Sequence, residues 1–268
     1  MSNSLPIGVF DSGLGGLTVV KALKDLMPNE NIIYFGDTAH IPYGTKSSET
    51  VTHYSKQITG FLSDKNVKLI VVACNTASAL ALPVIKQTFD IPMIGVIEPG
   101  AEAAVNATKS GVIGVIGTIS TISSGAYSSR IRNLNSNLIT SDQACPLFVP
   151  LAEEGWTTGD VPRMIAETYL NYFNSNNVDT VILGCTHYPL LKKTIQSVLN
   201  PGVQLIDSSE AVSEAVAKLL HDKDNEANRE KDGTLTCYVT DMPQKFEELG
   251  RRFLGEALLD VSLVHLDW

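Results

Sequence analysis

Two of the four cysteines in this sequence stand where a thiol can take part in chemistry. Cys74 and Cys185 each end an apolar run that predicts a buried strand, and each directly precedes a segment that predicts the start of a helix. The pKa of a thiol falls at a helix N-terminus or beside a cation, which makes both residues candidate bases. Cysteine is also among the residue types most often buried as a small hydrophobe, so a packing role is the alternative. For Cys145, which precedes a proline, and Cys237, which lies inside a predicted strand, we expect only the packing role.

Titratable side chains follow the same set of predicted strands. His187 lies just beyond Cys185, Asp11 ends the first predicted strand, and Glu153 and Asp37 follow two others. A carboxylate or an imidazole beside a thiol can orient it or exchange its proton. Each residue also has a simpler interpretation: His187 as a helix-start cap, Asp11 and Asp37 as turn residues, and Glu153 as part of a solvated turn.

The glycine-rich segment DSGLGG (residues 11–16) is not a nucleotide-binding motif. Gly13 and Gly15 are followed by Thr18, where the dinucleotide fingerprint requires a glycine or alanine. The segment GTKS (44–47) lacks the order Gly-Lys-Ser or Gly-Lys-Thr of a P-loop. We expect the backbone amides of residues 12–16 to hold a carboxylate at a helix N-terminus.

One thiol on each side of a cleft fits a two-sided proton transfer. Inverting a carbon centre requires a base on one face and an acid on the other, and two cysteines can exchange these roles. A thiolate is a workable base for a carbon acid when water is kept out of the site. This hypothesis needs Cys74 and Cys185 to face each other between two parts of the fold.

The elements that must position these residues alternate between short apolar runs and helical patterns. A helical stripe is clearest at 17–27 and 160–173, and a strand at 234–240 followed by a helix at 243–254 is expected near the end. The alternation predicts an α/β fold with right-handed βαβ units and mostly parallel sheets flanked by helices. The runs that predict buried strands are 7–10, 31–36, 67–74, 93–96, 111–117, 147–151, 180–185 and 203–206.

The two halves of the chain resemble each other, which predicts an internal duplication. Each half has a strand, a glycine-containing turn and, more than 60 residues later, a strand that ends in a cysteine. We therefore expect two similar lobes with the active site between them. The first lobe is predicted to comprise residues 1–96 and 208–268 and the second residues 97–207, with a solvated loop at 221–233.

The composition excludes several classes of protein. Hydrophobic residues make up 44% and charged residues 18% of the 268 residues, which is typical of an ordered globular protein. The net charge of −9 argues against a non-specific nucleic-acid binder, and no apolar run is long enough for a membrane helix. Widely spaced cysteines and no signal-peptide pattern favour a cytoplasmic protein without disulfides.

Five segments resemble the signature blocks of bacterial glutamate racemases, within the aspartate/glutamate racemase superfamily. They occur in the family's order and spacing, and the resemblance runs from residue 7 to about residue 210. Ala152 departs from the family, which often has a larger aliphatic residue there, so a pocket wall is expected to be wider. The segments are DSGLGGLTV (11–19), FGDTAHIPYG (35–44), ACNTASA (73–79), PLAEEG (150–155) and GCTHYPLL (184–191).

The resemblance implies an enzyme that interconverts L-glutamate and D-glutamate without a cofactor or a metal and supplies D-glutamate for peptidoglycan. It implies that Cys74 is the base acting on D-glutamate and Cys185 the base acting on L-glutamate. Asp37 is implied as a supporting polar group. The implied partner is the small-molecule substrate, with no nucleic acid and no membrane, and the family is often homodimeric.

The resemblance also assigns the neighbours of each thiol. Asp11 would assist Cys74, and His187, with Glu153 nearby, would assist Cys185. Hydroxyls and backbone amides would hold the two carboxylates and the ammonium group. The residues implied to bind substrate are Asp11, Ser12, Tyr43, Gly44, Asn75, Thr76, Thr118, Thr121, Thr186 and His187.

Three other hypotheses remain open at this point. The chain could be a racemase for aspartate or a hydantoin, which would use the same two-cysteine logic. It could be a non-catalytic protein that binds a small acid, with the cysteines as packing residues. It could also hold a metal through Cys74, Cys185 and His187.

Overall fold

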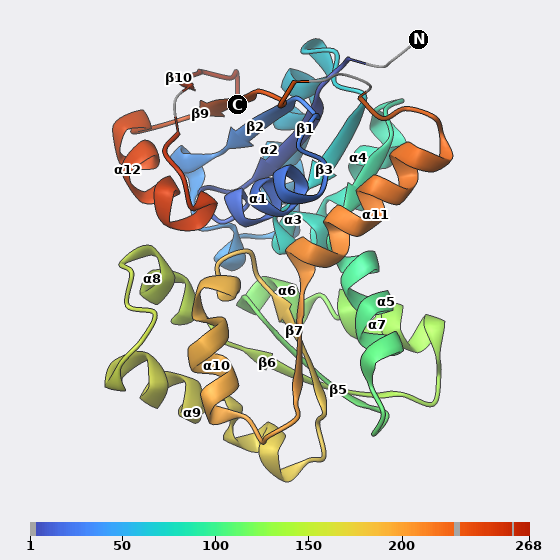
Figure 1. Ribbon diagram of the computed structural model, residues 1–268, viewed down its shortest axis with the longest axis vertical. Coiled ribbons are helices and arrows are strands. Elements are labelled where there is room, and N and C mark those ends of the chain that lie inside the picture. The colour runs from blue at the N-terminus through green and yellow to red at the C-terminus, as the bar shows by residue number, and fades with distance from the viewer. Residues whose placement is uncertain (1–3, 228–230, 259) are drawn as a thin grey trace.

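Two parallel sheets, one in each lobe, organise the chain (Figure 1). The structure is a computed structural model that describes residues 4–227, 231–258 and 260–268. Every strand pairing in both sheets is parallel. The first sheet contains β1 (Ile7–Asp11), β2 (Ile32–Gly36), β3 (Leu69–Val72), β4 (Met93–Gly95), β9 (Leu235–Val239) and β10 (Val261–Leu263). The second contains β5 (Val112–Gly117), β6 (Ile139–Ala144), β7 (Thr180–Gly184) and β8 (Gln204–Asp207).

Helices cover both faces of each sheet. The α-helices are α1 (Leu17–Leu26), α2 (Ser48–Asp64), α3 (Asn75–Leu80), α4 (Leu82–Thr88), α5 (Ile97–Ala107), α6 (Ile119–Ser123), α7 (Ala126–Leu134), α8 (Phe148–Glu153), α9 (Asp160–Ser175), α10 (Lys192–Val198), α11 (Ser208–Asp222) and α12 (Pro243–Leu254). Three short 3-10 helices are η1 (Thr38–His40), η2 (Tyr43–Thr45) and η3 (Tyr188–Leu191). The α/β fold with two lobes and two parallel sheets confirms the predicted fold class.

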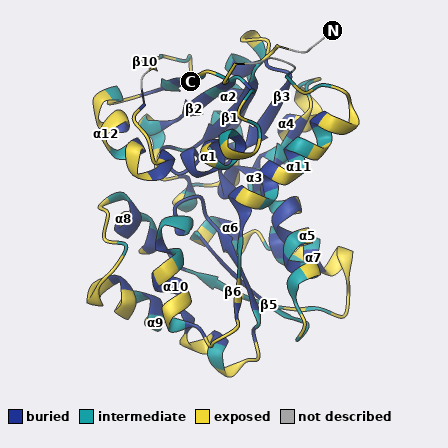
Figure 2. Cartoon of the chain, viewed as in Figure 1, coloured by how far each residue is buried: buried dark blue, intermediate teal, exposed yellow. Residues whose placement is uncertain are grey.

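The central strands are apolar because both of their faces are covered. β1, β3 and β7 are buried at every residue, and Figure 2 shows them dark blue between the helices. In β1 the side chains alternate, so that Val9 packs on the side of α1, α11 and α12 while Phe10 packs on the side of α2. In the second lobe α5 and α7 cover one face, and α9 and α10 cover the other.

The two sheets share one strand order. The first runs β10-β9-β2-β1-β3-β4 and the second β6-β5-β7-β8. When the first four strands of each sheet are numbered along the chain, both sheets place them in the order second, first, third, fourth. This common order supports the duplication that the sequence predicts. In each sheet the order reverses beside the first strand, and ligands of open α/β sheets bind at the carboxyl ends of the strands at that point. Those ends belong to β1 and β3 in one lobe and to β5 and β7 in the other.

One predicted strand is wrong, and two strands of the structure were not predicted. Residues 147–151 were expected as a strand but lie in α8 and its N-cap, Leu147. The strand that occupies the edge of the second sheet is β6, with the sequence ITSDQA, which pairs with β5 alone. No residue of β6 is fully buried, so it carries no apolar run that sequence reasoning could recognise. The C-terminal strand β10 is short and was also not predicted.

The predicted loop at 221–233 begins later than expected, because α11 continues to Asp222. Residues 228–230 of this segment lie outside the described residues. α11 packs against α1 of the first lobe and α5 of the second, and it follows β8, so it links the two lobes (Figure 1). None of the described helices is long and apolar enough to cross a membrane.

Candidate active site

Both predicted catalytic cysteines line one pocket between the lobes. The pocket encloses about 160 Å³ and lies beyond the carboxyl ends of β1, β3, β5 and β7. Pockets for drug-sized ligands are roughly 300–1,000 Å³, so this one suits a small molecule. Cys74 and Cys185 are 5% and 6% exposed, which leaves each thiol almost out of contact with bulk water.

The first wall is built around Cys74, which caps the N-terminus of α3. Its sulfur accepts a hydrogen bond from the Ala77 N–H at 3.5 Å and lies 3.8 Å from the Ser12 Oγ. Burial, together with the negative charge of Asp11, raises the pKa of Cys74 to about 12, although the contacts with Ala77 and Ser12 act in the opposite direction. Cys74 therefore carries its proton at neutral pH in this state of the site.

The second wall is built around Cys185, which directly follows β7. Its sulfur lies 3.8 Å from the Nδ1 atom of His187, and the Nε2 atom of His187 lies 3.0 Å from Glu153 Oε1. Burial alone lowers the pKa of His187, but the hydrogen bonds to Cys185 and Glu153 and the charges of these groups raise it to about 10. An imidazolium at neutral pH therefore lies beside the Cys185 sulfur and stabilises negative charge there.

Asp11 lies behind the first wall and does not line the pocket. It is completely buried, its Oδ2 accepts a hydrogen bond from the Gly13 N–H at 3.0 Å, and its Oδ1 lies 3.4 Å from the Thr186 Oγ1. Burial raises the pKa of Asp11, while the charge of His187 and the amides of Gly13 and Gly16 oppose this rise. The amides of the glycine-rich turn, where an anion site is predicted, thus hold a carboxylate of the chain itself.

Gly15 allows the glycine-rich turn to meet the second lobe. A Cβ atom at this position would lie 2.1 Å from the Thr186 Oγ1 and 2.5 Å from the His187 Nδ1. Only a residue without a side chain fits this approach. The Thr18 hydroxyl also lies 3.2 Å from the Thr186 carbonyl oxygen, so the start of α1 contacts the loop that carries Cys185.

Asp37 reaches the pocket only through another residue. It is completely buried, and its two oxygens accept hydrogen bonds from the hydroxyls of Tyr43 at 2.6 Å and Thr240 at 2.8 Å. The Nδ1 atom of His40 lies 2.7 Å from the same carboxylate. Tyr43 lines the pocket, so Asp37 fixes a pocket wall and does not contact a ligand there.

Polar groups from both lobes meet on the far side of the pocket. The hydroxyls of Thr76, Thr118 and Thr121 form a triangle with oxygen separations of 3.0, 3.2 and 2.9 Å. Thr118 also caps α6 by accepting the Thr121 N–H. The Nδ2 atom of Asn75 is buried and has no hydrogen-bond partner within the described part of the chain. These groups can hold the carboxylate and ammonium groups of an amino acid.

Most of the predicted site residues come together, and some do not. Asp11, Asp37 and Thr121 lie behind the lining residues. The predicted residues that line the pocket are Ser12, Tyr43, Gly44, Cys74, Asn75, Thr76, Thr118, Glu153, Cys185, Thr186 and His187.

Sequence reasoning missed the apolar part of the pocket. Those lining residues are Ile41, Pro42, Ile119, Pro146, Val149 and Pro150. Ile41 and Pro42 stand beside the predicted Tyr43, and Ile119 follows Thr118, so proximity in the sequence was the available signal. The contribution of α8 was hidden because its residues were assigned to a strand.

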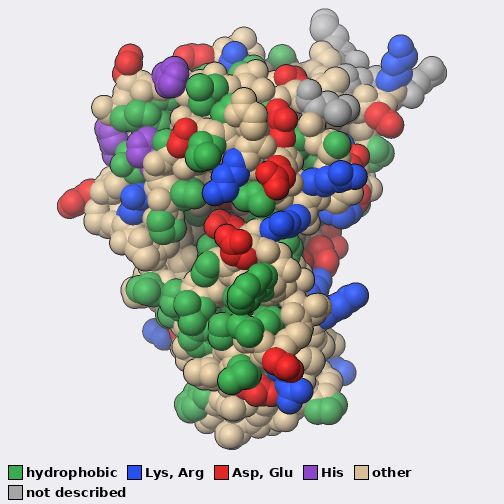
Figure 3. All heavy atoms as spheres, turned by 90° about the vertical axis from the view of Figure 1, so that its left-hand side faces the viewer, with side chains coloured by type: hydrophobic (Ala, Val, Ile, Leu, Met, Phe, Trp, Pro, Cys, Tyr) green, Lys and Arg blue, Asp and Glu red, His purple; other side chains and the backbone are tan. Residues whose placement is uncertain are grey.

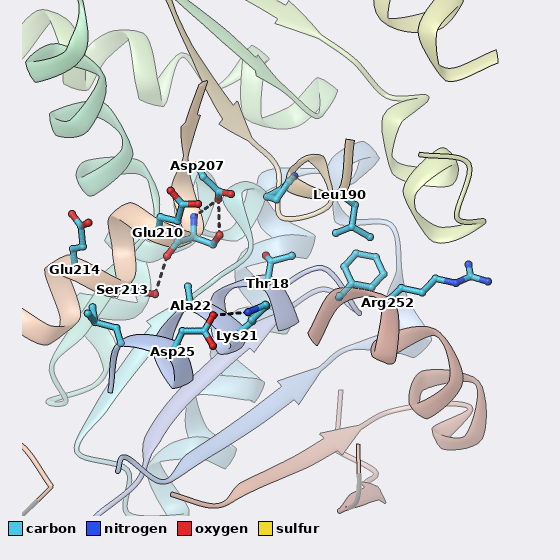
Figure 4. Close-up of a pocket in the computed structure, with 14 residues that line it drawn as sticks. Thr18, Lys21, Ala22, Asp25, Leu190, Asp207, Glu210, Ser213, Glu214 and Arg252 are labelled. Atoms are coloured by element: carbon cyan, nitrogen blue, oxygen red, sulfur yellow. Dashed lines mark hydrogen bonds and ion pairs between the residues drawn. The ribbon is translucent and has the colours of Figure 1, made fainter. Parts of the chain in front are cut away.

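A larger hollow lies between α1, α11, η3 and α12 (Figure 4). It measures about 530 Å³ but contains neither cysteine. Of its basic side chains Lys21 and Arg252, the first is paired with Asp25, and Asp207 accepts hydrogen bonds from the backbone and hydroxyl of Ser209. The smaller pocket is therefore the candidate site, because it gathers the thiols and the titratable groups with shifted pKa values.

The described residues contain no group of three or more His, Cys, Asp and Glu side chains arranged to hold a metal ion.

The fold and the pocket together define a two-lobed α/β protein with one thiol from each lobe at a shared site. Comparison with known proteins agrees with this class. The family model described as Asp/Glu/Hydantoin racemase matches residues 17–216. The chain therefore belongs to the Asp/Glu/hydantoin racemase family, and it is an enzyme of the isomerase class.

Similar proteins cover almost the whole chain. A glutamate racemase of Geobacter metallireducens is 51% identical over 261 residues, which is 97% of each protein. A glutamate racemase of Chlorobaculum parvum is 52% identical over 266 residues, 98% of this chain and 97% of the relative. The crystal structure of a glutamate racemase from Francisella tularensis in complex with D-glutamate is 42% identical, covers 98% of both chains and has a TM-score of 0.92.

Proposed function

We propose that this enzyme is a glutamate racemase that moves the α-proton between two cysteines, Cys74 and Cys185. The observation that carries the proposal is a pair of nearly inaccessible thiols, one from each lobe, at one pocket with different charged neighbours. A two-base racemisation requires this arrangement, because the proton leaves one face of the carbon and arrives on the other. The reaction needs no cofactor.

In the direction from L-glutamate to D-glutamate, Cys185 acts as the base. Its sulfur, as the thiolate beside the imidazolium of His187, takes the α-proton and becomes a thiol. The pair of electrons left on carbon then takes a proton from the opposite face, where Cys74 holds one. Cys74 becomes the thiolate, and the reverse reaction uses the same two steps in the opposite order.

The neighbours of each thiol have separate tasks. Glu153 keeps His187 protonated, so that His187 can stabilise the Cys185 thiolate and return a proton to it. Asp11 lies behind the pocket and acts on Cys74 through its charge. Lobe contacts at Gly15 and the burial of both thiols exclude water, which strengthens these electrostatic effects.

Among the substrates of the family, glutamate is the one that we propose for this enzyme. The relatives with about half of their residues identical are named glutamate racemases, and the Francisella tularensis structure contains D-glutamate. The pocket also supplies donors away from the thiols, at Asn75, Thr76 and the Tyr43–Gly44 turn, for a second carboxylate. An aspartate or hydantoin racemase is the remaining alternative within the same fold.

The test is racemisation by the purified protein without any added cofactor. Circular dichroism should show the loss of optical activity of L-glutamate and of D-glutamate, and the product formed in D₂O should carry deuterium at the α-carbon. Turnover of aspartate alone would contradict glutamate as the substrate. Product without deuterium would contradict proton transfer as the mechanism.

Two further tests separate the remaining alternatives. Loss of activity in Cys74→Ala or Cys185→Ala is incompatible with a non-catalytic binding protein. Full activity after exhaustive chelation is incompatible with a metal site at Cys74, Cys185 and His187.

We also propose a homodimer in the cytoplasm whose D-glutamate serves peptidoglycan synthesis. Figure 3 shows hydrophobic side chains gathered on one side of the second lobe. In the segment from α8 to α9 of this lobe, Leu147, Trp156 and Met164 are exposed apolar residues. Exposed apolar patches of this kind support an interaction surface. Light scattering should give the mass of a dimer, and Trp156→Glu should shift it toward that of a monomer. A monomeric wild-type protein would contradict this part of the proposal.

The lobes are proposed to comprise residues 1–96 with 208–268, and residues 97–207. The composition of the two sheets supports this division, because the strands from β5 to β8 lie within the second range. Limited proteolysis should cut near residues 97 and 207 if these boundaries are hinges between folded units.

A further inference from the structure

Asn75 lines the pocket and carries a side-chain donor, Nδ2, that has no hydrogen-bond partner among the described residues. Neither Ser55 nor Arg130, whose Oγ and Nε atoms are likewise buried without a partner among the described residues, lines the pocket. Asn75 as a whole is 2% exposed. A buried polar group without a partner costs free energy, so such an atom at a site indicates that a ligand completes its hydrogen bonds.

The opposite end of the same amide is occupied. The Tyr127 hydroxyl donates a hydrogen bond to the Asn75 Oδ1 at 2.7 Å. An amide has an acceptor at one end and two donors at the other, so while the Tyr127 hydroxyl donates to Oδ1, the Nδ2 end lies on the opposite side. This hydrogen bond stabilises the flip state of the Asn75 side chain that the structure shows.

Tyr127 is itself held rigidly. Tyr127 as a whole is 2% exposed, and it stands on α7 of the second lobe. A Cβ atom on Gly184, the last residue of β7, would lie 3.1 Å from the Cε2 atom of Tyr127, so the ring packs directly against the backbone before Cys185. Asn75 begins α3 of the first lobe, which means that the hydrogen bond joins the two lobes at the pocket.

We propose that Tyr127 is a positioning residue that orients the Asn75 amide so that its nitrogen donates to a carboxylate of glutamate. The inference rests on the proposed function for the identity of the ligand. In the correct flip state two N–H groups face the carboxylate, whereas in the opposite state an oxygen would face it and repel it. Since Tyr127 and Asn75 belong to different lobes, the donor is set only when the lobes are together.

The decisive variant is Tyr127→Phe, which removes the hydroxyl and keeps the ring. We expect KM for both enantiomers to rise roughly tenfold while kcat changes less than about threefold, because one oriented hydrogen bond is lost in binding. In an Asn75→Ala background the same substitution should have no further effect on KM. Tyr169→Phe, which removes a tyrosine hydroxyl of the same lobe outside the pocket, is the matched control and should leave KM unchanged.

Wild-type turnover of glutamate is measured first, so that failure of the proposed function is recognised separately. If wild type racemises glutamate and Tyr127→Phe has the wild-type KM, the inference is wrong. It is equally wrong if the KM effects of Tyr127→Phe and Asn75→Ala simply multiply. Should Tyr127→Phe fail to fold, Asn75→Asp replaces the donor with a carboxylate oxygen and keeps an acceptor for Tyr127. Its KM should then rise at least tenfold, and an unchanged KM would overturn the inference.

Discussion

Cys74 and Cys185 line one pocket but have neighbours of opposite charge. Cys74 lies near the buried carboxylate of Asp11, and its pKa is raised to about 12. Cys185 lies 3.8 Å from His187, whose pKa is raised to about 10 by Cys185 and Glu153 once the opposing effect of burial is overcome. At neutral pH the site therefore holds a proton on the first wall and positive charge beside the second.

The difference teaches that one pocket can hold an acid and a base of the same residue type. L- and D-glutamate have equal free energy in water, so kcat/KM must be the same in both directions for wild type and for every variant. The asymmetry of the walls can therefore appear only in kcat and KM separately, in the pH dependence, or in proton exchange without inversion. The following predictions use these measurements.

Replacing either thiol should have the largest effect. We expect Cys74→Ser and Cys185→Ser each to lower racemisation by about 10²–10⁴-fold, because a general acid or base on one face is lost. In D₂O, Cys74→Ser should still exchange the α-proton of L-glutamate, and Cys185→Ser that of D-glutamate, as followed by proton NMR. Glutamate should still bind to both variants. Undiminished turnover in either variant would show that the replaced cysteine is not one of the two catalytic bases.

Forcing the walls apart should have the next largest effect. Gly15→Ala places a methyl group against Thr186 and His187, and overpacking of this kind costs about 1–3 kcal/mol. We expect kcat/KM to fall roughly tenfold to a hundredfold. Gly60→Ala in α2 is the control, since its Cβ would meet nothing closer than 3.9 Å. Equal kinetics for the two variants would exclude a role for the close lobe contact.

Removing the charge of Asp11 should make the two walls more alike. In Asp11→Asn the pKa of Cys74 should fall below its value of about 12, because one of the influences that raise it is gone. Alkylation of Cys74 should then begin at lower pH, as measured by mass spectrometry across a pH series. Racemisation should fall about tenfold. Asp90→Asn, at an exposed position, should change neither measurement.

Removing Glu153 should weaken the other wall. Glu153→Gln should lower the pKa of His187 from about 10, because an anionic partner is lost, and NMR titration of the imidazole measures this directly. His187 has a higher pKa in the folded protein than the ordinary 6.5, so its contribution to stability is complete below about pH 6.5. That contribution is lost as the pH rises through about 10 in wild type and at lower pH in the variant.

Deprotonation of His187 also sets the alkaline limit of activity, and Glu154→Gln is the control variant. Racemisation by Glu153→Gln should decline at lower pH than racemisation by wild type, with a loss of a few-fold at neutral pH. Glu154→Gln removes a neighbouring, exposed carboxylate and should leave both the titration and the pH profile as in wild type. An unshifted His187 in Glu153→Gln would contradict the assigned pair.

The two other cysteines should matter least. Cys145 and Cys237 are buried and lie away from the pocket lining, and burial raises the pKa of both thiols. Alanine at either position should leave kcat and KM within about twofold of wild type. The free energy of unfolding should fall by about 1 kcal/mol through lost packing. A large loss of activity in either variant would mean that a third thiol takes part in the reaction.

Much of the fold and site follows from local sequence patterns. β1, β3 and β7 have uniform apolar runs because both of their faces are buried, and the polar residues after them stand at the carboxyl ends of parallel strands. β6 escaped prediction because an edge strand with a half-exposed surface needs no apolar run. Residues 147–151 were misread because a short apolar segment suits a strand or a buried helix equally well.

Contacts between segments that are distant in the chain could not be predicted from the sequence. Nothing in the sequence indicates that Gly15 meets Thr186 or that Tyr127 holds Asn75, because these pairs depend on how the lobes are placed. The role of Asp37 was also only partly predictable. Its position after a strand suggested a polar site, but its contact with Tyr43 places it behind the pocket wall.

The hydroxyl triangle of Thr76, Thr118 and Thr121 has a consequence for how the pocket receives an anion. Each hydroxyl has one hydrogen to give, so three mutual contacts engage all three hydrogens. The hydrogens can circulate in either sense, which gives the ring two possible proton arrangements. A carboxylate that takes a hydrogen from Thr76 or Thr118 opens the ring and fixes its sense. The three hydroxyls thus satisfy one another until a ligand binds, and a bound carboxylate leaves only one of the two proton arrangements.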